Sequence, residues 1–408
     1  MTDINKLKLL KKSKGVRMSK KYNIITAIIT VVIILFTGCS SNQINVNINQ
    51  NSEEYIANED FQNYIDSFSS FIKVDGGYYF ITDLKLYFYD TEKKESYLVC
   101  SKTNCKHQNS DCLAYLSPFQ FYHGMSVRYY DNNIYILGYE QEKTVKHNYI
   151  FQFSLNNFKR KKAAYLFDSS GQISTLFIVH RGYVYYVNCT YEMKENTVSI
   201  FRVKLGEIEK NAPQKIFEFS GIGTNIFGLS AYGNKLFFMT SSYEDEAGNG
   251  YNSILNYMDI HTLETNQIPE RKYSHTADSG KVYYGKDEKT VECYDLKTKE
   301  TTFFCNINGP CYISADSKYI YFDNKQKMYI DENFKDRKIY VYDKSGNYIT
   351  EIVPKNPEDD CYFGGDDVMI FKEITVTGEV VESEGAKGYY VLDKSQITSP
   401  DKQFIDME

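Results

Sequence analysis

Tryptophan is absent from this sequence of 408 residues, and proline occurs only seven times. Long apolar runs are also scarce, because the stretch Asn23–Phe36 is shorter than the ~20 residues of a comfortable membrane-spanning helix. One short run excludes a polytopic membrane protein. Basic residues are outnumbered, with 47 Lys and Arg against 53 Asp and Glu. An acidic chain is a poor ligand for nucleic acid, so we expect no nucleic-acid partner.

Motifs that mark common catalytic sites are missing as well. The sequence has no G-x-S-x-G nucleophile elbow, no H-E-x-x-H helix and no phosphate-binding loop. The acidic stretch 244–250 lacks the spacing of a calcium-binding EF-hand and is interpreted as a solvated hairpin tip. Three histidines lie near expected strand ends: His180, His261 and His275. They could converge on the channel of the fold, but we interpret them as separate surface residues.

Aromatic residues are abundant, with 38 Tyr and 26 Phe. Both residue types favour pleated, half-buried surfaces, so the composition predicts an all-β protein. The chain is 42% hydrophobic and 25% charged, which is typical of a globular protein and not of a disordered one.

The first 39 residues have the organisation of a secretory signal. Residues 1–21 carry eight basic side chains and one acid, and the short apolar run follows. Leu35–Ser41, LFTGCSS, resembles the lipobox of bacterial lipoproteins, in which small residues precede a cysteine that becomes lipid-modified. The resemblance implies a diacylglycerol on Cys39, which would become the mature amino terminus. Phe36 departs from the aliphatic residue usual there, and an uncleaved membrane anchor is the alternative.

Residues 40–59 are polar and rich in asparagine, so we expect a flexible stalk. Cleavage before Cys39 would remove eight basic residues and one acid, which leaves 39 basic against 52 acidic residues and a net charge of −13. The lipid, and not the surface charge, would then hold the protein at the outer face of the membrane. The predicted organisation is a signal over 1–39, a stalk over 40–59 and a folded domain over 60–408.

A two-part signature returns roughly every 50 residues along this domain. Its first part is a polar or glycine-containing turn followed by a strand-like run of aliphatic and aromatic residues. The seven copies begin at Asp75, Asp131, Arg181, Gly233, Ser279, Asp316 and Gly365. Its second part is another strand, with copies that begin at Leu86, Ile150, Ile200, Leu255, Val291, Ile339 and Tyr389. With a strand before each turn, each unit has about four antiparallel strands.

Seven four-stranded units predict a β-propeller. One such unit cannot bury both of its faces alone, whereas radial stacking packs each sheet on its neighbours and leaves only short edges open. An open solenoid is the alternative, and the repeat length favours closure. Counts of six or eight blades are also compatible with the pattern.

The repeats resemble those of the extracytoplasmic TolB-like propellers. The lack of tryptophan argues against the WD-repeat and pyrroloquinoline-type propellers, which depend on it. The similarity is greatest to a group of lipoproteins from clostridial-type bacteria with a propeller domain of unknown function, and it covers about residues 68–397. The resemblance implies a surface lipoprotein that binds a ligand, with no assigned chemistry.

The most specific local motif is C-x4-C-x-H-x4-C, formed by Cys100, Cys105, His107 and Cys112. Three thiolates and one imidazole make a complete tetrahedral zinc set, and a site with four protein ligands is closed and structural. The same group of lipoproteins often carries such an insertion. The alternative is a disulfide between two of these cysteines, with a solvated His107, in an oxidising compartment.

Four further cysteines lie in the later repeats. Cys293 and Cys305 flank a hairpin turn and form a candidate disulfide if the strand register places them opposite each other. Cys311 and Cys361 occupy equivalent places in successive repeats and are expected to fill the core.

These observations predict a membrane-anchored, extracytoplasmic lipoprotein that acts as a binding or scaffolding module. Its ligand would be a protein, peptide or glycan held on one propeller face, and its only cofactor would be structural zinc. The alternative is an extracellular hydrolase or lyase with its site in the propeller channel. A structural role in an envelope complex is a third interpretation.

Overall fold

The computed structural model describes residues 52–62, 71–109, 111–117, 120–121, 126–157, 159–170, 176–191, 196–268, 274–329, 334–363, 365–374 and 388–407. The predicted signal, Cys39 and residues 40–51 of the predicted stalk lie outside these ranges. Residues Gln50–Glu408 form one compact unit. Within the described ranges, no helix has the length and apolar character needed to cross a membrane.

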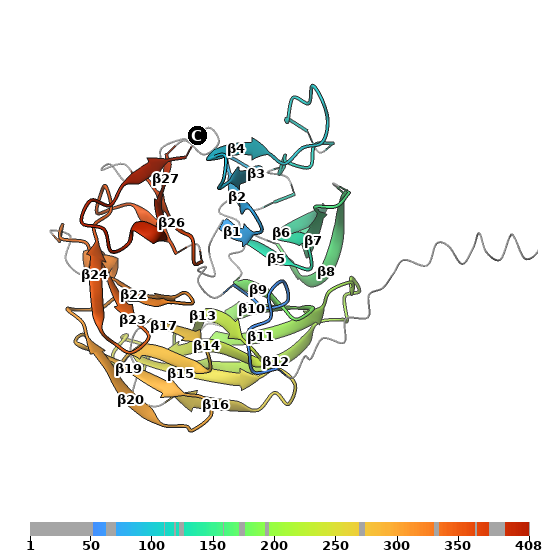
Figure 1. Ribbon diagram of the computed structural model, residues 1–408. Coiled ribbons are helices and arrows are strands. Elements are labelled where there is room, and N and C mark those ends of the chain that lie inside the picture. Colours follow the sequence, from blue (N-terminus) through green and yellow to red (C-terminus); the bar gives the residue numbers. More distant parts are fainter. Residues whose placement is uncertain are drawn as a thin grey trace, which may run out of the picture. The chain divides into compact units, whose positions relative to one another are not determined.

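The described residues form a seven-bladed β-propeller, as the repeats predict (Figure 1). Each blade is an antiparallel sheet of four consecutive strands. Blades one to four contain β1 (Phe71–Val74), β2 (Gly77–Thr82), β3 (Lys85–Asp90), β4 (Glu95–Leu98); β5 (Val127–Tyr130), β6 (Asn133–Glu142), β7 (Val145–Ser154), β8 (Lys159–Ser169); β9 (Phe177–His180), β10 (Tyr183–Tyr191), β11 (Asn196–Lys204), β12 (Gln214–Gly221); and β13 (Asn225–Tyr232), β14 (Lys235–Ser242), β15 (Asn252–Asp259), β16 (Thr265–Ile268).

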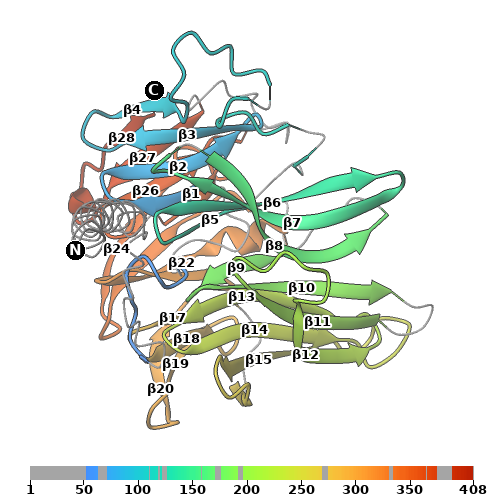
Figure 2. The same ribbon diagram turned by 90° about the vertical axis from the view of Figure 1, so that its right-hand side faces the viewer.

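Blades five to seven complete the ring. They contain β17 (His275–Asp278), β18 (Lys281–Gly285), β19 (Thr290–Asp295), β20 (Thr301–Asn306); β21 (Tyr312–Ala315), β22 (Tyr319–Asp323), β23 (Ile339–Asp343), β24 (Tyr348–Ile352); and β25 (Asp360–Tyr362), β26 (Val368–Lys372), β27 (Tyr389–Asp393), β28 (Phe404–Asp406). Two short 3-10 helices, η1 (Asn324–Tyr329) and η2 (Lys394–Gln396), follow β22 and β27. Figure 2 shows the blades from the side, with the long hairpin of β6 and β7 projecting beyond blade one.

The turn signatures of the sequence lie between the first and second strand of each blade. Asp131 and Asn132 join β5 to β6 with φ angles of 45° and 56°, the two left-handed conformations that a two-residue type I′ turn requires. Such a turn twists in the same sense as the strands and so holds the hairpin in register. Short polar turns followed by apolar runs therefore set the blade pattern locally.

Side chains close the ring between blade seven and blade one. All four strands of blade seven come from the carboxyl-terminal part of the chain, so blade one exchanges no strand with it. The rings of Phe71 and Tyr389 pack with their centroids 5.2 Å apart. Lys73 forms an ion pair with Asp367 at 3.2 Å. Closure therefore depends on a shared aromatic core and on polar contacts at its edge.

Residues 52–62, here called the strap, lie against the inner turns of blades two to four. Arg181, in the turn of blade three, pairs with the Asp60 carboxylate at 2.7 Å and donates hydrogen bonds to the carbonyls of Ser52 and Glu54. Both charged side chains are almost completely buried. The described part of the predicted stalk, residues 52–59, thus packs on the blades.

His180 is buried beneath the strap and forms a hydrogen bond to it. Its Nδ1 accepts the backbone N–H of Phe61 at 3.1 Å, and its Nε2 donates to the carbonyl of Gly233 at 2.8 Å. Burial lowers the pKa of His180 to about 4, so the ring is neutral at pH 7. The interpretation of His180 as a surface residue is wrong, because the strap covers it.

Candidate metal centre

Cys100, Cys105, His107 and Cys112 converge at one point in the loop between blades one and two. One ligand atom from each residue lies within 4.8 Å of all the others. His107 Nδ1 lies 3.2 Å from Cys112 Sγ. Zinc–sulfur and zinc–nitrogen bonds of about 2.3 and 2.0 Å place tetrahedral ligands about 3.5–3.8 Å apart, so a metal fits this set after small side-chain adjustments.

The backbone turns twice to bring these groups together. Asn104 and His107 both have positive φ angles, 59° and 53°, which folds the short loop back on itself. The N–H of His107 hydrogen-bonds to the Cys105 thiol and lowers its pKa. Burial instead raises the pKa of Cys112 to about 11. Because metals bind thiolates, loading this site would release the Cys112 proton, and metal affinity would rise with pH.

The loop is fastened to blade one by backbone hydrogen bonds. The N–H of Leu86, in β3, donates to the carbonyl of Ala114 at 2.8 Å, and the N–H of Leu116 donates to the carbonyl of Leu84 at 2.7 Å. On the other side, the N–H of Tyr139 in β6 donates to the carbonyl of Gln120 at 2.7 Å. The metal-binding loop therefore bridges two blades.

Arg160 fixes the same loop from blade two. Its Nη2 donates to the carbonyls of Cys112, Leu113 and Tyr115 at 3.4, 3.3 and 2.9 Å. Its guanidinium lies over the ring of Phe153, 4.7 Å from the centroid. Burial lowers the pKa of Arg160 to about 10, so the side chain stays charged at pH 7. No motif marks Arg160 in the sequence, because its role depends on the packing of β8 against a distant loop.

The cluster has the number and kinds of ligand that a metal ion needs. A disulfide would involve only two of the three thiols. It would not explain why a nitrogen of His107 lies next to a cysteine sulfur. All eight cysteines of the described residues are free thiols. The four-ligand set can hold a metal, and its soft donors suit zinc or iron better than calcium or magnesium.

The strand register corrects the expectation that Cys293 and Cys305 face each other. Cys293 pairs with Thr302, and Cys305 pairs with Val291. The pairing next to the turn already offsets the two strands, and a bulge between Val291 and Glu292 shifts the register by only one residue, so the two cysteines are diagonal on neighbouring strands. Diagonal neighbours are about 7–8 Å apart, beyond the usual disulfide spacing. Both thiols instead pack in the core between blades five and six.

The remaining residues singled out in the sequence have structural or surface positions. Cys311 lies in the core, as predicted, and burial raises its pKa to about 12. Asp245 accepts hydrogen bonds from the N–H groups of Ala247 and Asn249, so the acidic hairpin tip is closed by its own turn. His261 is exposed on another turn.

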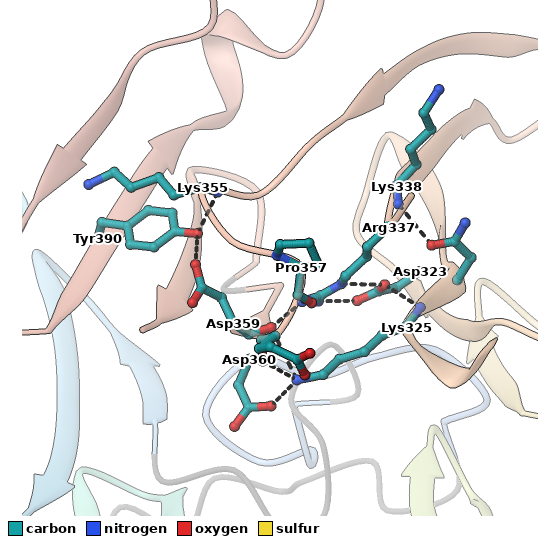
Figure 3. A network of polar contacts seen from close by, with 11 residues as sticks. Asp323, Lys325, Arg337, Lys338, Lys355, Pro357, Asp359, Asp360 and Tyr390 are labelled. Atoms are coloured by element: carbon teal, nitrogen blue, oxygen red, sulfur yellow. Dashed lines mark hydrogen bonds and ion pairs between the residues drawn. The ribbon is translucent and has the colours of Figure 1, made fainter. Parts of the chain in front are cut away.

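A buried polar network joins blades six and seven (Figure 3). Arg337 makes two hydrogen bonds to the Asp323 carboxylate, at 3.0 and 2.6 Å, and also donates to the carbonyl of Asp359. The hydroxyl of Tyr390 donates to the Asp359 carboxylate at 2.6 Å. Burial lowers the pKa of Arg337, but its charge and hydrogen-bond interactions with Asp323 outweigh this and leave the pKa raised. These groups are turned toward one another, so the network fastens two blades.

No family model matches the sequence, and no curated protein matches it. Solved structures with a similar fold include an uncharacterized protein from Listeria monocytogenes EGD-e, at 12% identity and a TM-score of 0.40, covering 68% of this chain and 81% of that chain. Oligogalacturonate lyase from Vibrio parahaemolyticus matches at 10% identity and 0.41, covering 66% and 74%. BamB from Moraxella catarrhalis matches at 7% and 0.37, covering 81% and 94%. These similarities carry no argument about ligand or activity.

Proposed function

We propose that this chain is an extracytoplasmic lipoprotein that presents a β-propeller at the membrane as a binding or scaffolding module. The lipobox-like sequence supports a lipid on Cys39. The strap is the observation that carries the proposal, because the chain just beyond this anchor is built into the propeller by the buried pair of Asp60 and Arg181. A rigid body on a short tether suits presentation of a surface to a protein, peptide or glycan.

The length of the tether sets how far the propeller can stand from the membrane. Twelve residues separate Cys39 from Ser52, the first residue that the strap places on the blades. A fully extended chain of that length spans at most about 45 Å, roughly the thickness of one bilayer. The propeller would therefore stay close to the surface that carries the lipid.

Structural zinc is part of the same proposal. A site with four protein ligands leaves no open position for a substrate or a reactive water, so a metal there would order the loop between blades one and two. Arg160 and the backbone contacts of β3 would hold the loaded loop against both blades. Ligand binding would then belong to the propeller surface and not to the metal.

Replacing Cys39 with alanine tests the anchor. We expect the variant to leave the membrane fraction, because a two-chain lipid contributes about 0.8 kcal/mol per buried CH₂ and is the anchor proposed for the acidic domain. Fractionation of cells and intact mass of the protein would measure this. Cys189→Ala, which removes a thiol elsewhere, should stay with the membrane. Unchanged retention of Cys39→Ala would contradict the lipid anchor and favour an uncleaved apolar segment.

A further inference from the structure

A small cavity lies between blades three and four. Its volume is about 160 Å³, and its lining residues are Arg181, Tyr183, Tyr185, Arg202, Ile260 and His261. Pockets that enclose a whole small molecule usually measure about 300–1,000 Å³. This cavity is therefore the size of an end group, and the exposed His261 places its mouth at the surface.

Arg202 brings an unneutralised positive charge to the cavity. Its Nε donates to Gln214 at 2.9 Å, and its Nη1 donates to the carbonyl of Ile260 at 2.7 Å. No carboxylate among the described residues forms an ion pair with it. A guanidinium has five N–H donors, so these two bonds leave three for an occupant of the cavity.

The neighbouring cations are already neutralised. Arg181 pairs with the buried Asp60 at 2.7 Å, and Lys235 pairs with Asp259 at 2.7 Å. Arg202 thus supplies one net positive charge, which matches a monoanion such as a carboxylate better than a phosphate dianion. Arginine also suits carboxylate oxygens geometrically, because its donors lie in one plane.

Tyr185 adds a second kind of donor. Only 1% of this residue is exposed, and it lines the cavity together with Arg202. The hydroxyl proton can be donated to a group that enters the cavity. A carboxylate in the cavity would find guanidinium N–H groups and one hydroxyl, and hydrogen bonds to a charged group are stronger than those between neutral groups.

We propose that this cavity binds the carboxylate of a uronic acid residue at the end of a glycan, an inference that rests on the binding function proposed above. The half-buried ring of Tyr183, which lies 5.5 Å from the Arg202 guanidinium carbon, offers a flat surface to a sugar ring. A peptide would ordinarily pair with a free strand edge, but β10 and β11, which carry the tyrosines and Arg202, have a partner strand on both sides. The site therefore does not suit a peptide that binds by adding a strand.

Titration calorimetry on the purified full chain in detergent tests this assignment. The probes are sodium D-glucuronate, the neutral D-glucose and N-acetylglycine as a peptide-like carboxylate. We expect glucuronate to bind at least about ten times more tightly than glucose. Arg202→Gln should weaken glucuronate binding at least about tenfold, and Tyr185→Phe about threefold to tenfold. Lys204→Gln, which removes an exposed charge from the same strand, should change affinity by less than about twofold.

Equal affinity for glucuronate and glucose would overturn the proposal, as would equal binding by wild type and both cavity variants. Binding of N-acetylglycine as tightly as glucuronate would overturn the choice of a sugar acid. If Arg202→Gln does not fold, the conservative Tyr185→Phe variant still decides the outcome. Loss of the lipid anchor would not affect this measurement, so failure here and failure of the anchor are separable.

Discussion

Replacing Asp323 with alanine is expected to lower the free energy of unfolding by about 3–5 kcal/mol. Asp323 and Arg337 are 3% and 1% exposed, and their side chains form two hydrogen bonds. Removing the carboxylate leaves a buried guanidinium without its counter-charge, which costs far more than an exposed pair contributes. Urea unfolding followed by far-ultraviolet circular dichroism is the appropriate measurement, since the chain has no tryptophan for fluorescence.

Asp360→Ala is the matched control within the same network. Asp360 pairs with Lys325 at 2.6 Å, but its side chain is 46% exposed. Lys325 also donates to two backbone carbonyls and so keeps partners after the substitution. We expect a loss of no more than about 1 kcal/mol. Equal small losses from Asp323→Ala and Asp360→Ala would contradict the assignment of this network as the tie between blades six and seven.

Asp60→Ala is expected to release the strap and to destabilise the propeller by about 3–5 kcal/mol. The substitution leaves Arg181 buried without a charge partner, although its bonds to the carbonyls of Ser52 and Glu54 remain. Two amides report the release directly, because Arg181 N–H donates to Glu59 and Phe61 N–H donates to His180. Hydrogen exchange of these amides, together with urea unfolding, measures the effect.

Asp401→Ala provides the control for the strap. Asp401 is exposed near the carboxyl terminus, and its backbone N–H donates to Ser399 Oγ at 3.3 Å. Its carboxylate forms no ion pair with any of the described residues. A surface substitution of this kind usually changes stability by less than about 0.5 kcal/mol. Retained protection of the strap amides in Asp60→Ala would show that the ion pair does not hold this segment, and the account of the strap as a part of the propeller held by Arg181 would be wrong.

The blade pattern could be predicted because its causes are local. Turns such as Asp131-Asn132 adopt the left-handed conformations that a tight hairpin needs, and the aromatic runs after them suit buried strands. The convergence of Cys100, Cys105, His107 and Cys112 could be predicted for the same reason, since 13 residues contain the whole set. Short spacing limits how far such groups can separate.

The contacts between residues far apart in the sequence could not be predicted. Asp60 and Arg181 are 121 residues apart, and no pattern in the sequence links them. The same holds for Arg160, whose partners lie on a loop of the neighbouring blade. Cys293 and Cys305 do not face each other because the two strands pair off the symmetric register, and sequence patterns show neither register nor bulges reliably.

Metal content is the most direct test of the candidate centre on which this account depends. Native mass spectrometry of the purified chain should show one metal ion per molecule, removed by a chelator and absent from His107→Ala. His261→Ala, which removes an exposed histidine far from the cluster in sequence, should keep the metal. Absence of metal would contradict a metal centre. If the denatured mass were also lower by two hydrogens for each disulfide bond, the cluster would instead contain a disulfide.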